Sequence, residues 1–184
     1  KLIAFVGVGN MGCPMAENLM KSGKTVKVFD VSEKMLQIAR DKNLETVTNL
    51  NDLLTADVGT VITMLPEGKH SKEVYLGEKG IINKVSKSCL LIDCSTIDIQ
   101  TSIEIGKKAA EKGINMIDAP VSGGVMGAQK ATLNIMVGGS KEAFDKALPL
   151  LKIMGKSIFH AGDLGSGNGA KICNNMALGI AMIA

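Results

Sequence analysis

The chain has 184 residues, of which 46% are apolar and 21% are charged, and its formal net charge is +3. This length suits one domain or little more, and the composition excludes a disordered or collagen-like polymer. The sequence has no basic run and no row of aromatic residues, so a nucleic-acid-binding protein is not expected. Cys13, Cys89, Cys94 and Cys173 lack the close pairing of a metal site and are too scattered for a disulfide framework, which favours a reducing compartment.

Short apolar runs alternate along the chain with stretches that carry apolar residues at helical spacing. Runs of this length suit strands that are buried on both faces of a parallel sheet. The expected strands are Leu2–Val8, Val26–Asp30, Val58–Leu65, Cys89–Asp93, Asn115–Asp118, Leu133–Val137 and Ser157–His160. The expected helices between them are Met11–Lys21, Ser32–Lys42, Lys69–Leu76, Asp98–Lys112 and Lys141–Ile153. This alternation predicts an α/β fold with a Rossmann-type, doubly wound and mostly parallel sheet.

Capping residues and glycines mark where these elements start and stop. Ser32 and Asp98 are candidates for N-terminal caps, and Gly23 and Gly113 are well placed to end helices. A glycine-rich break over residues 161–169 divides a nucleotide-binding domain, residues 1–162, from a final helix over residues 163–184. That helix ends in an apolar run too short to span a membrane, so we expect no membrane partner and a further helical domain that lies outside this sequence.

The run Gly7-Val8-Gly9-Asn10-Met11-Gly12 follows the first expected strand and opens the first helix. In a dinucleotide site the first such glycine permits the tight turn, the second lets a pyrophosphate approach the backbone, and the third lets the helix pack closely on the strand. The helix N-terminus adds free N–H groups and a positive dipole end for the phosphates. Taken alone, the pattern also fits an ordinary glycine turn.

Asp30 supports the dinucleotide interpretation because it ends the second expected strand, 18 residues after Gly12. A carboxylate at this place accepts hydrogen bonds from the hydroxyls of the adenine ribose. It would repel a ribose 2′-phosphate, and no arginine sits beside it, so NAD is expected rather than NADP. The alternative is that Asp30 serves only the start of the following helix.

Two further strand ends open into the same crevice, because ligands bind beyond the carboxyl ends of the strands in open α/β sheets. The first is Thr63-Met64-Leu65-Pro66, in which Leu65 and Pro66 are placed to cover the adenosine or the ribose. The second is Asp93-Cys94-Ser95-Thr96, in which Thr96 is placed to hydrogen-bond near the nicotinamide. A role for Thr96 as only a cap for the next helix fits the sequence equally well.

Two segments near the end of the chain carry candidate reacting groups. Ser122, Gly123 and Gly124 follow an expected strand, and their hydroxyl and N–H groups predict a nest for an anion such as a carboxylate, although a plain turn is the simpler alternative. Lys171 is the only charged residue between Leu164 and Ala184 and lies about one turn into the final helix.

Burial and the positive end of the helix dipole would lower the pKa of Lys171 toward the working pH, as a general acid/base requires. Asn175 lies four residues further on, so its side chain projects from the same helix face. The alternative is a surface lysine that reaches into solvent.

The sequence resembles the β-hydroxyacid dehydrogenase family in three separated runs, which occur in the same order as in that family: Gly7–Gly12, Asp118–Gly124 and Gly167–Asn175. The resemblance covers the whole chain. The resemblance implies that Lys171 is the catalytic acid/base, that Asn175 helps to hold the substrate, and that the nest at Ser122, Gly123 and Gly124 binds the substrate carboxylate. It also implies further cofactor contacts, at Met64, Leu65, Pro66, Thr96 and His70. His70 departs from the asparagine expected there.

The function that the resemblance implies is the NAD-dependent oxidation of 3-hydroxyisobutyrate to methylmalonate semialdehyde in valine degradation. It implies a homodimer or homotetramer built through a helical C-terminal domain, in the mitochondrial matrix or, in a prokaryote, the cytoplasm. One alternative is a sister enzyme that reduces tartronate semialdehyde, glyoxylate or succinate semialdehyde. Another is a relative of 6-phosphogluconate dehydrogenase, for which the substrate loop offers only Lys130. A third is a catalytically silent nucleotide-binding module, although such relatives lose the lysine.

Overall fold

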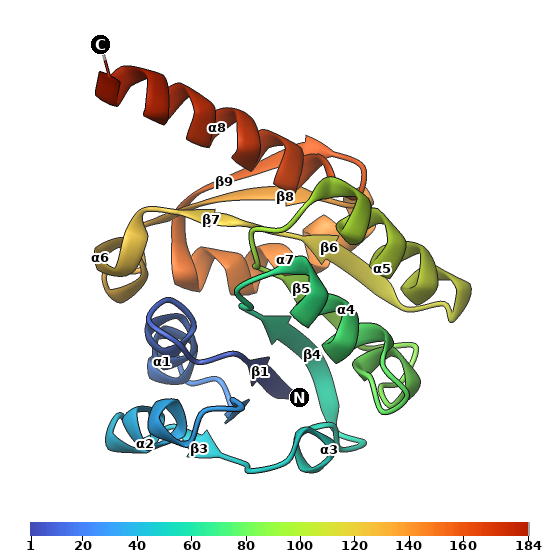
Figure 1. Ribbon diagram of the computed structural model, residues 1–184. Coiled ribbons are helices and arrows are strands. Elements are labelled where there is room, and N and C mark those ends of the chain that lie inside the picture. The colour runs from blue at the N-terminus through green and yellow to red at the C-terminus, as the bar shows by residue number, and fades with distance from the viewer. Residues whose placement is uncertain (184) are drawn as a thin grey trace.

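The computed structural model describes residues 1–183 and places a nine-stranded sheet at the centre of the molecule (Figure 1). The strands are β1 Leu2–Val6, β2 Val26–Phe29, β3 Glu45–Thr46, β4 Val58–Thr63, β5 Leu90–Asp93, β6 Asn115–Asp118, β7 Val121–Ser122, β8 Leu133–Gly138 and β9 Gly155–Gly162. Their order is β3-β2-β1-β4-β5-β6-β8-β7, with β9 paired to β8. Strands β1 to β6 pair in parallel, while β8 runs antiparallel to β6 and β7. The predicted doubly wound, mostly parallel fold is therefore confirmed.

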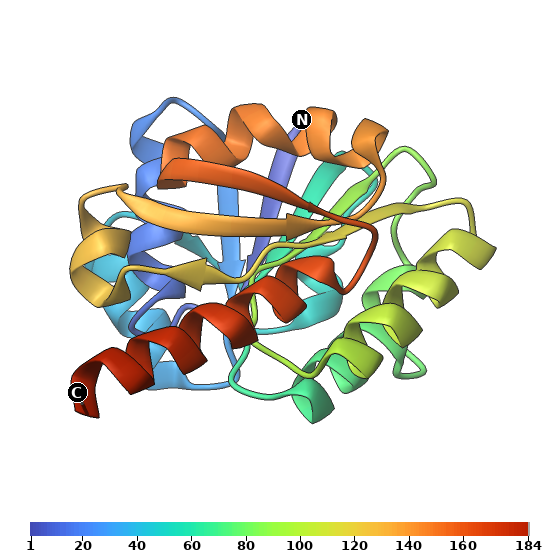
Figure 2. The ribbon, with the colours of Figure 1, turned by 90° about the horizontal axis from the view of Figure 1, so that it is seen from above.

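Helices cover both faces of the sheet (Figure 2). They are α1 Gly12–Lys21, α2 Glu33–Asp41, α3 Leu50–Leu53, α4 Gly68–Leu76, the 3-10 helix η1 Ile81–Asn83, α5 Ile99–Glu111, α6 Gly124–Gln129, α7 Lys141–Met154 and α8 Ser166–Ile183. One face carries α1, α2, α6 and α7, and the other carries α3, α4 and α5. The crossovers of a parallel sheet require this arrangement, because each returning helix must bury its apolar stripe on the sheet.

The core consists of two apolar layers, one on each face of the sheet. Successive residues of a strand point to opposite faces, so Ile62 and Ile92 enter one layer while Val61 and Leu91 enter the other. All four side chains are fully buried. This two-sided burial explains why the central strands read as continuous apolar runs rather than as alternating patterns.

The structure confirms several of the expected helix ends and corrects others. Gly23 and Gly113 follow α1 and α5 with φ angles of 85° and 72°, which suit glycine at the end of a helix. Asp98 caps α5 by accepting a hydrogen bond from the backbone N–H of Thr101 at 2.8 Å. Ser32 precedes α2 at the N-cap position, but its side chain makes no capping hydrogen bond.

Five short elements were not predicted: β3, β7, α3, α6 and the 3-10 helix η1. Each has two to six residues, which is too short for a hydrophobic period to be visible in the sequence. The segment after Asp118 is therefore not a plain loop or turn: it contains the short strand β7 and then the six-residue helix α6.

The last helix, α8, packs against the sheet only at its beginning. Its first turns lie against β8, β9 and α5, and the rest of the helix extends away from the sheet toward the side of the molecule on which α6 lies (Figures 1 and 2). In the projecting part Met176, Ile180 and Met182 are 63%, 66% and 79% exposed. No helix within residues 1–183 combines the length and the apolar character needed to cross a bilayer.

The core layers predict a large difference between two isoleucine truncations. Ile92 in β5 is fully buried, whereas Ile38 on α2 is 37% exposed. We expect Ile92→Ala to lower the free energy of unfolding by about 2–5 kcal/mol, because it leaves a cavity between sheet and helices. Ile38→Ala should cost about 0.5 kcal/mol or less. Urea denaturation of both variants measures the difference, and equal losses would contradict this description of the core.

Candidate active site

A cleft of about 560 Å³ opens at the carboxyl ends of β1, β2 and β4. The sheet order explains its position, because β1 lies between β2 and β4 and the chain crosses over in opposite directions on its two sides. The residues that line the cleft are Val6, Gly7, Gly9, Asn10, Met11, Gly12, Phe29, Asp30, Val31, Met35, Met64, Leu65, Pro66, His70, Glu73 and Val74. This lining is largely apolar, contains two acidic residues, and includes no lysine or arginine.

The three glycines of the loop between β1 and α1 differ in the space around them. Gly7 has a φ of 89°, and a Cβ there would collide with the carbonyl oxygen of Met64. A Cβ on Gly12 would collide with the carbonyl oxygen of Gly7 and lie 3.1 Å from the ring of Phe5. Gly9 has no atom within 4 Å of such a Cβ, so its backbone faces open space. The first and third glycines are needed for packing, and the second leaves the loop open to a ligand.

Asp30 holds the glycine loop against the end of β2. Its carboxylate accepts hydrogen bonds from the backbone N–H of Val8 and from that of Ser32, both at 2.8 Å. Val8 itself is fully buried and does not line the cleft. Each carboxylate oxygen keeps a further lone pair, so Asp30 can still accept a hydrogen bond from a ribose hydroxyl.

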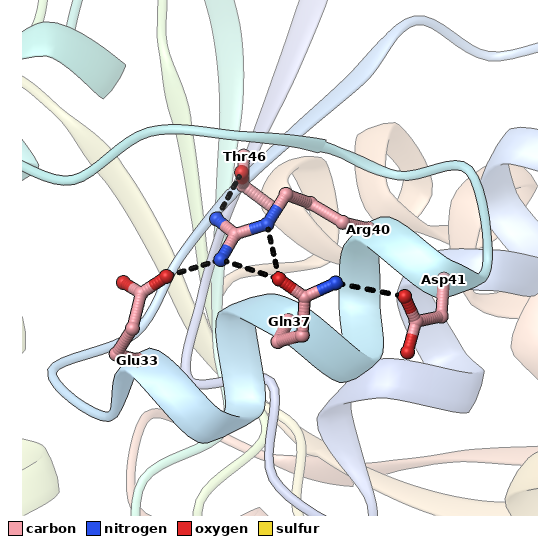
Figure 3. A network of polar contacts seen from close by, with 5 residues as sticks. All are labelled: Glu33, Gln37, Arg40, Asp41 and Thr46. Carbon is pink, nitrogen blue, oxygen red and sulfur yellow. Dashed lines mark hydrogen bonds and ion pairs between the residues drawn. The ribbon is translucent and has the colours of Figure 1, made fainter.

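Arg40, the only arginine of the chain, lies near the end of α2 and outside the lining of this cleft (Figure 3). Its guanidinium group donates to Gln37 at 3.1–3.2 Å and to the hydroxyl of Thr46 at 3.2 Å, and it pairs with Glu33. Gln37 in turn donates to Asp41 at 2.8 Å. The strongest phosphate-binding side chain of the sequence is therefore held on the outer surface of α2.

A buried polar network fixes the loops that follow β4 and β5. Asp93 is 1% exposed and accepts hydrogen bonds from the hydroxyl of Thr63 and the backbone N–H of Ser95, both at 2.9 Å. The hydroxyl of Ser95 accepts from the backbone N–H of Leu65 at 2.8 Å, and Thr63 also bonds the hydroxyl of Tyr75 at 2.8 Å. Burial raises the pKa of Asp93 above its ordinary value. The network holds Leu65 at the wall of the cleft.

Lys171 occupies the second turn of α8 and is only 8% exposed. Burial lowers the pKa of its amine below the ordinary lysine value, because a charged amine loses hydration there. The interpretation of Lys171 as a surface lysine is therefore wrong. Asn175 lies one turn further along α8 and is exposed.

The start of α8 is anchored to the end of β6 by buried side chains. The carboxylate of Asp118 accepts from the backbone N–H groups of Gly165 and Asn168, both at 2.7 Å. The amide of Asn168 donates to Ser102 at 2.9 Å and accepts from the backbone N–H of Ile97 at 3.0 Å. Asp118 and Asn168 are both fully buried, and burial raises the pKa of Asp118.

Ser122, Gly123 and Gly124 lie at the junction of β7 and α6, close to α8. Both glycines are exposed and have φ angles of 133° and 62°. The hydroxyl of Ser122 lies 3.5 Å from the side-chain amide nitrogen of Asn174 on α8, in donor–acceptor contact. The turn is thus built at a strand–helix junction that only glycines adopt readily, and its hydroxyl faces the helix that carries Lys171.

The predicted site residues fall into two groups in the structure. Ten of them line the cleft, namely Gly7, Gly9, Asn10, Met11, Gly12, Asp30, Met64, Leu65, Pro66 and His70. The second group is Ser122, Gly123, Gly124, Lys171 and Asn175 around β7 and α8. Thr96 is exposed outside the cleft lining, and it does not cap α5, since Asp98 does. Sequence reasoning missed the buried partners Asp118 and Asn168 and the exposed Asn174, although all three lie within the runs that it singled out.

A mostly parallel sheet with a glycine loop, an acidic strand end and an open helix N-terminus in one cleft defines a Rossmann-type NAD-binding domain. The chain belongs to the family described as the NAD binding domain of 6-phosphogluconate dehydrogenase, whose model matches residues 2–162.

Several relatives carry the same resemblance. The chain is 50% identical over 181 residues to a 3-hydroxyisobutyrate dehydrogenase of Pseudomonas aeruginosa, covering 98% of the chain and 60% of the relative. It is 43% identical over 184 residues to an NAD-dependent L-serine dehydrogenase of the same organism, covering all of the chain and 61% of the relative. A solved structure of the Mycobacterium tuberculosis 3-hydroxyisobutyrate dehydrogenase with L-serine matches 99% of the chain and 61% of its own, with 38% identity and a TM-score of 0.93. These relatives confirm the resemblance to β-hydroxyacid dehydrogenases, and the chain spans about 60% of their length.

The space around the glycines predicts opposite effects for two alanine substitutions. Gly12→Ala should lower the free energy of unfolding by about 1–3 kcal/mol, because its Cβ collides with backbone. Gly9→Ala should leave stability unchanged and weaken NAD binding about tenfold or more, because its methyl group stands where the pyrophosphate approaches. Thermal denaturation and NAD titration of both variants distinguish the two roles. A Gly9→Ala variant that binds NAD normally would place the pyrophosphate elsewhere.

Proposed function

We propose that this chain, within its full-length protein, binds NAD and oxidises the primary alcohol of a small 3-hydroxy carboxylate, with Lys171 as general acid/base. The observation that carries the proposal is the burial of Lys171, which lowers the pKa of its amine; among the residues that the structure describes, no acidic side chain pairs with it to keep it charged. A lowered pKa increases the neutral fraction of the amine, and the neutral amine is the form that accepts a proton.

The cleft residues fit an NAD molecule. The open backbone of Gly9 and the N-terminus of α1 suit the pyrophosphate, Asp30 suits the adenine ribose, and Leu65 and Pro66 suit the adenosine side of the wall. The acidic lining and the engagement of Arg40 on α2 favour NAD over NADP, since a ribose 2′-phosphate would meet carboxylates and no cation. NAD supplies a hydride acceptor, and the chain supplies orientation and proton transfer.

In this proposal the residues around β7 and α8 bind the substrate and transfer its proton. The hydroxyl of Ser122 and the exposed N–H groups of Gly123 and Gly124 bind the substrate carboxylate, and Asn175 holds the reacting hydroxyl near Lys171. Neutral Lys171 would accept the proton of the substrate hydroxyl. Bound NAD would supply the acceptor for the hydride from the carbon that bears this hydroxyl, so that the alcohol becomes an aldehyde. In the reverse direction the protonated amine returns the proton to the carbonyl oxygen.

The substrate that we propose is 3-hydroxyisobutyrate, oxidised to methylmalonate semialdehyde. The relatives named above act, by their names, on 3-hydroxyisobutyrate and on L-serine. Both molecules carry a CH₂OH group on the carbon next to a carboxylate. In either molecule the nest at Ser122–Gly124 can therefore bind the carboxylate while Lys171 takes the proton of the hydroxyl. We also propose that residues 1–162 form the cofactor domain and that residues 163–184 lead out of it, which the end of the family match at residue 162 supports.

Removal of the Lys171 amine should abolish proton transfer but leave NAD binding intact. In the full-length protein, we expect Lys171→Ala to lower kcat by about 10²–10⁴-fold while the Kd for NAD stays within about twofold. Lys112→Ala, at the exposed end of α5, is the matched control and should keep wild-type activity. Wild-type kcat/KM for oxidation should rise with pH through the lowered pKa of Lys171, because the neutral amine is the active form. Near-normal turnover of Lys171→Ala would refute the proposal.

A substrate panel tests the chemistry directly. We expect the full-length protein to show its highest kcat/KM with 3-hydroxyisobutyrate and NAD, at least about tenfold above the value with NADP. The other members of the panel are L-serine and 6-phosphogluconate, assayed for oxidation with NAD or NADP, and tartronate semialdehyde, glyoxylate and succinate semialdehyde, assayed for reduction with NADH or NADPH. A preference for L-serine would keep the mechanism and change the substrate. Preference for a phosphorylated substrate or for NADP would contradict the assignment, and binding of NAD with no turnover would favour a silent module.

A further inference from the structure

We infer that Asp118 and Asn168 are positioning residues for Lys171, which they hold in place by fixing the first turn of α8 to β6 and α5. The inference rests on the proposed role of Lys171. It assigns a part in the reaction to two buried side chains that touch neither the cleft nor the nest.

The first contact is between a strand end and a helix start. A helix leaves four backbone N–H groups unpaired at its beginning, and the carboxylate of Asp118 takes up those of Gly165 and Asn168 at 2.7 Å each. The negative charge also lies at the positive end of the helix dipole. Asp118 therefore fixes where α8 begins relative to the sheet.

The second contact fixes the rotation of α8 about its axis. A side chain that only caps a helix accepts a hydrogen bond from a backbone N–H group of that helix. The side chain of Asn168 instead bonds two other segments, at the backbone of Ile97 and at the hydroxyl of Ser102 on α5. Both bonds are 3.0 Å or shorter, and Asn168 is fully buried. Lys171 lies three residues later on the same side of the helix, so a rotation that broke these bonds would also turn the amine.

The backbone is packed tightly around the contact between Asp118 and the start of α8. A Cβ on Gly138 would collide with the carboxylate of Asp118 and lie 2.7 Å from the backbone nitrogen of Gly167. A Cβ on Gly167 would lie 2.8 Å from two oxygens of Asp118. The helix start thus rests directly on the ends of β6 and β8, and α8 cannot shift without breaking the Asp118 bonds.

The variant that tests the inference is Asn168→Ala in the full-length protein, since it changes no charge. The charged or titratable side chains of the elements packed against α8 stay in place, including Asp118 of β6, His160 of β9 and Glu104 of α5. We expect kcat/KM for the hydroxy acid to fall about 10–100-fold, with the Kd for NAD within about twofold of wild type. The ionisation seen in the pH profile of kcat/KM should move to higher pH, because a loosened helix lets water reach the amine.

Asn49→Ala is the matched control. Asn49 caps α3 by accepting from the backbone N–H of Asn51 at 2.9 Å, so its loss removes an asparagine cap far from α8 in the fold. This variant should keep the wild-type pH profile and kcat/KM. The fraction of folded protein, measured by circular dichroism for each variant, corrects the rates for any loss of stability.

Three outcomes overturn the inference: an unchanged pH profile in Asn168→Ala, an activity loss that only follows the unfolded fraction, or an equal shift in Asn49→Ala. If Asn168→Ala does not fold, Ser102→Ala removes one of the two acceptors of the Asn168 amide nitrogen and leaves Asp118 as the other, at 3.4 Å, so it should shift the profile in the same direction by less. An unchanged profile there also overturns the inference. Activity of Lys171→Ala would instead refute the proposed function, whereas an inactive Lys171→Ala with a normal Asn168→Ala profile refutes the positioning role alone.

Discussion

Two buried carboxylates stand opposite each other at the carboxyl ends of neighbouring strands, and the geometry of the site depends on them. Asp93 of β5 and Asp118 of β6 are partners in the strand register, and each is at most 1% exposed. Burying a carboxylate is costly unless hydrogen bonds compensate for its lost hydration, so each must find donors beyond its own strand. Those donors belong to the loops and helices that form the site. The two carboxylates at the carboxyl ends of β5 and β6 therefore hold these loops and helices at fixed positions.

The two carboxylates serve different halves of the site. Asp93 binds Thr63 and Ser95, and through Ser95 it holds the backbone of Leu65 at the wall of the cleft. Asp118 binds the first N–H groups of α8, the helix that carries Lys171. The register of one strand pair therefore sets the distance between the cofactor half and the reacting half. A rigid sheet is well suited to this task, because sites supported by regular elements are held more precisely than sites on loops.

The sequence predicts the cofactor half more completely than the reacting half. Glycine spacing and a strand-end carboxylate are local patterns, so Gly7, Gly9, Gly12 and Asp30 could be placed in one cleft before any coordinates. The partners of Asp118 lie about 50 residues away in the sequence, at Gly165 and Asn168, and no periodicity connects them. The same limit applies to Arg40: its place in the expected helix Ser32–Lys42 is visible in the sequence, but its hydrogen bonds to Gln37 and Thr46 are visible only in the structure.

The place of Lys171 along α8 follows from where the burial of that helix ends. Lys171 is 8% exposed, whereas the next residue, Ile172, is 40% exposed and Met176 is 63% exposed. Within the described chain, a lysine placed one or two turns later would be hydrated, so burial would not lower its pKa. Only the beginning of α8 is buried, and the contact with the turn at Ser122 follows directly after it, through Asn174. The anchoring of that beginning by Asp118 and the lowered pKa of Lys171 are thus two consequences of the same packing of α8 against β6 and β8.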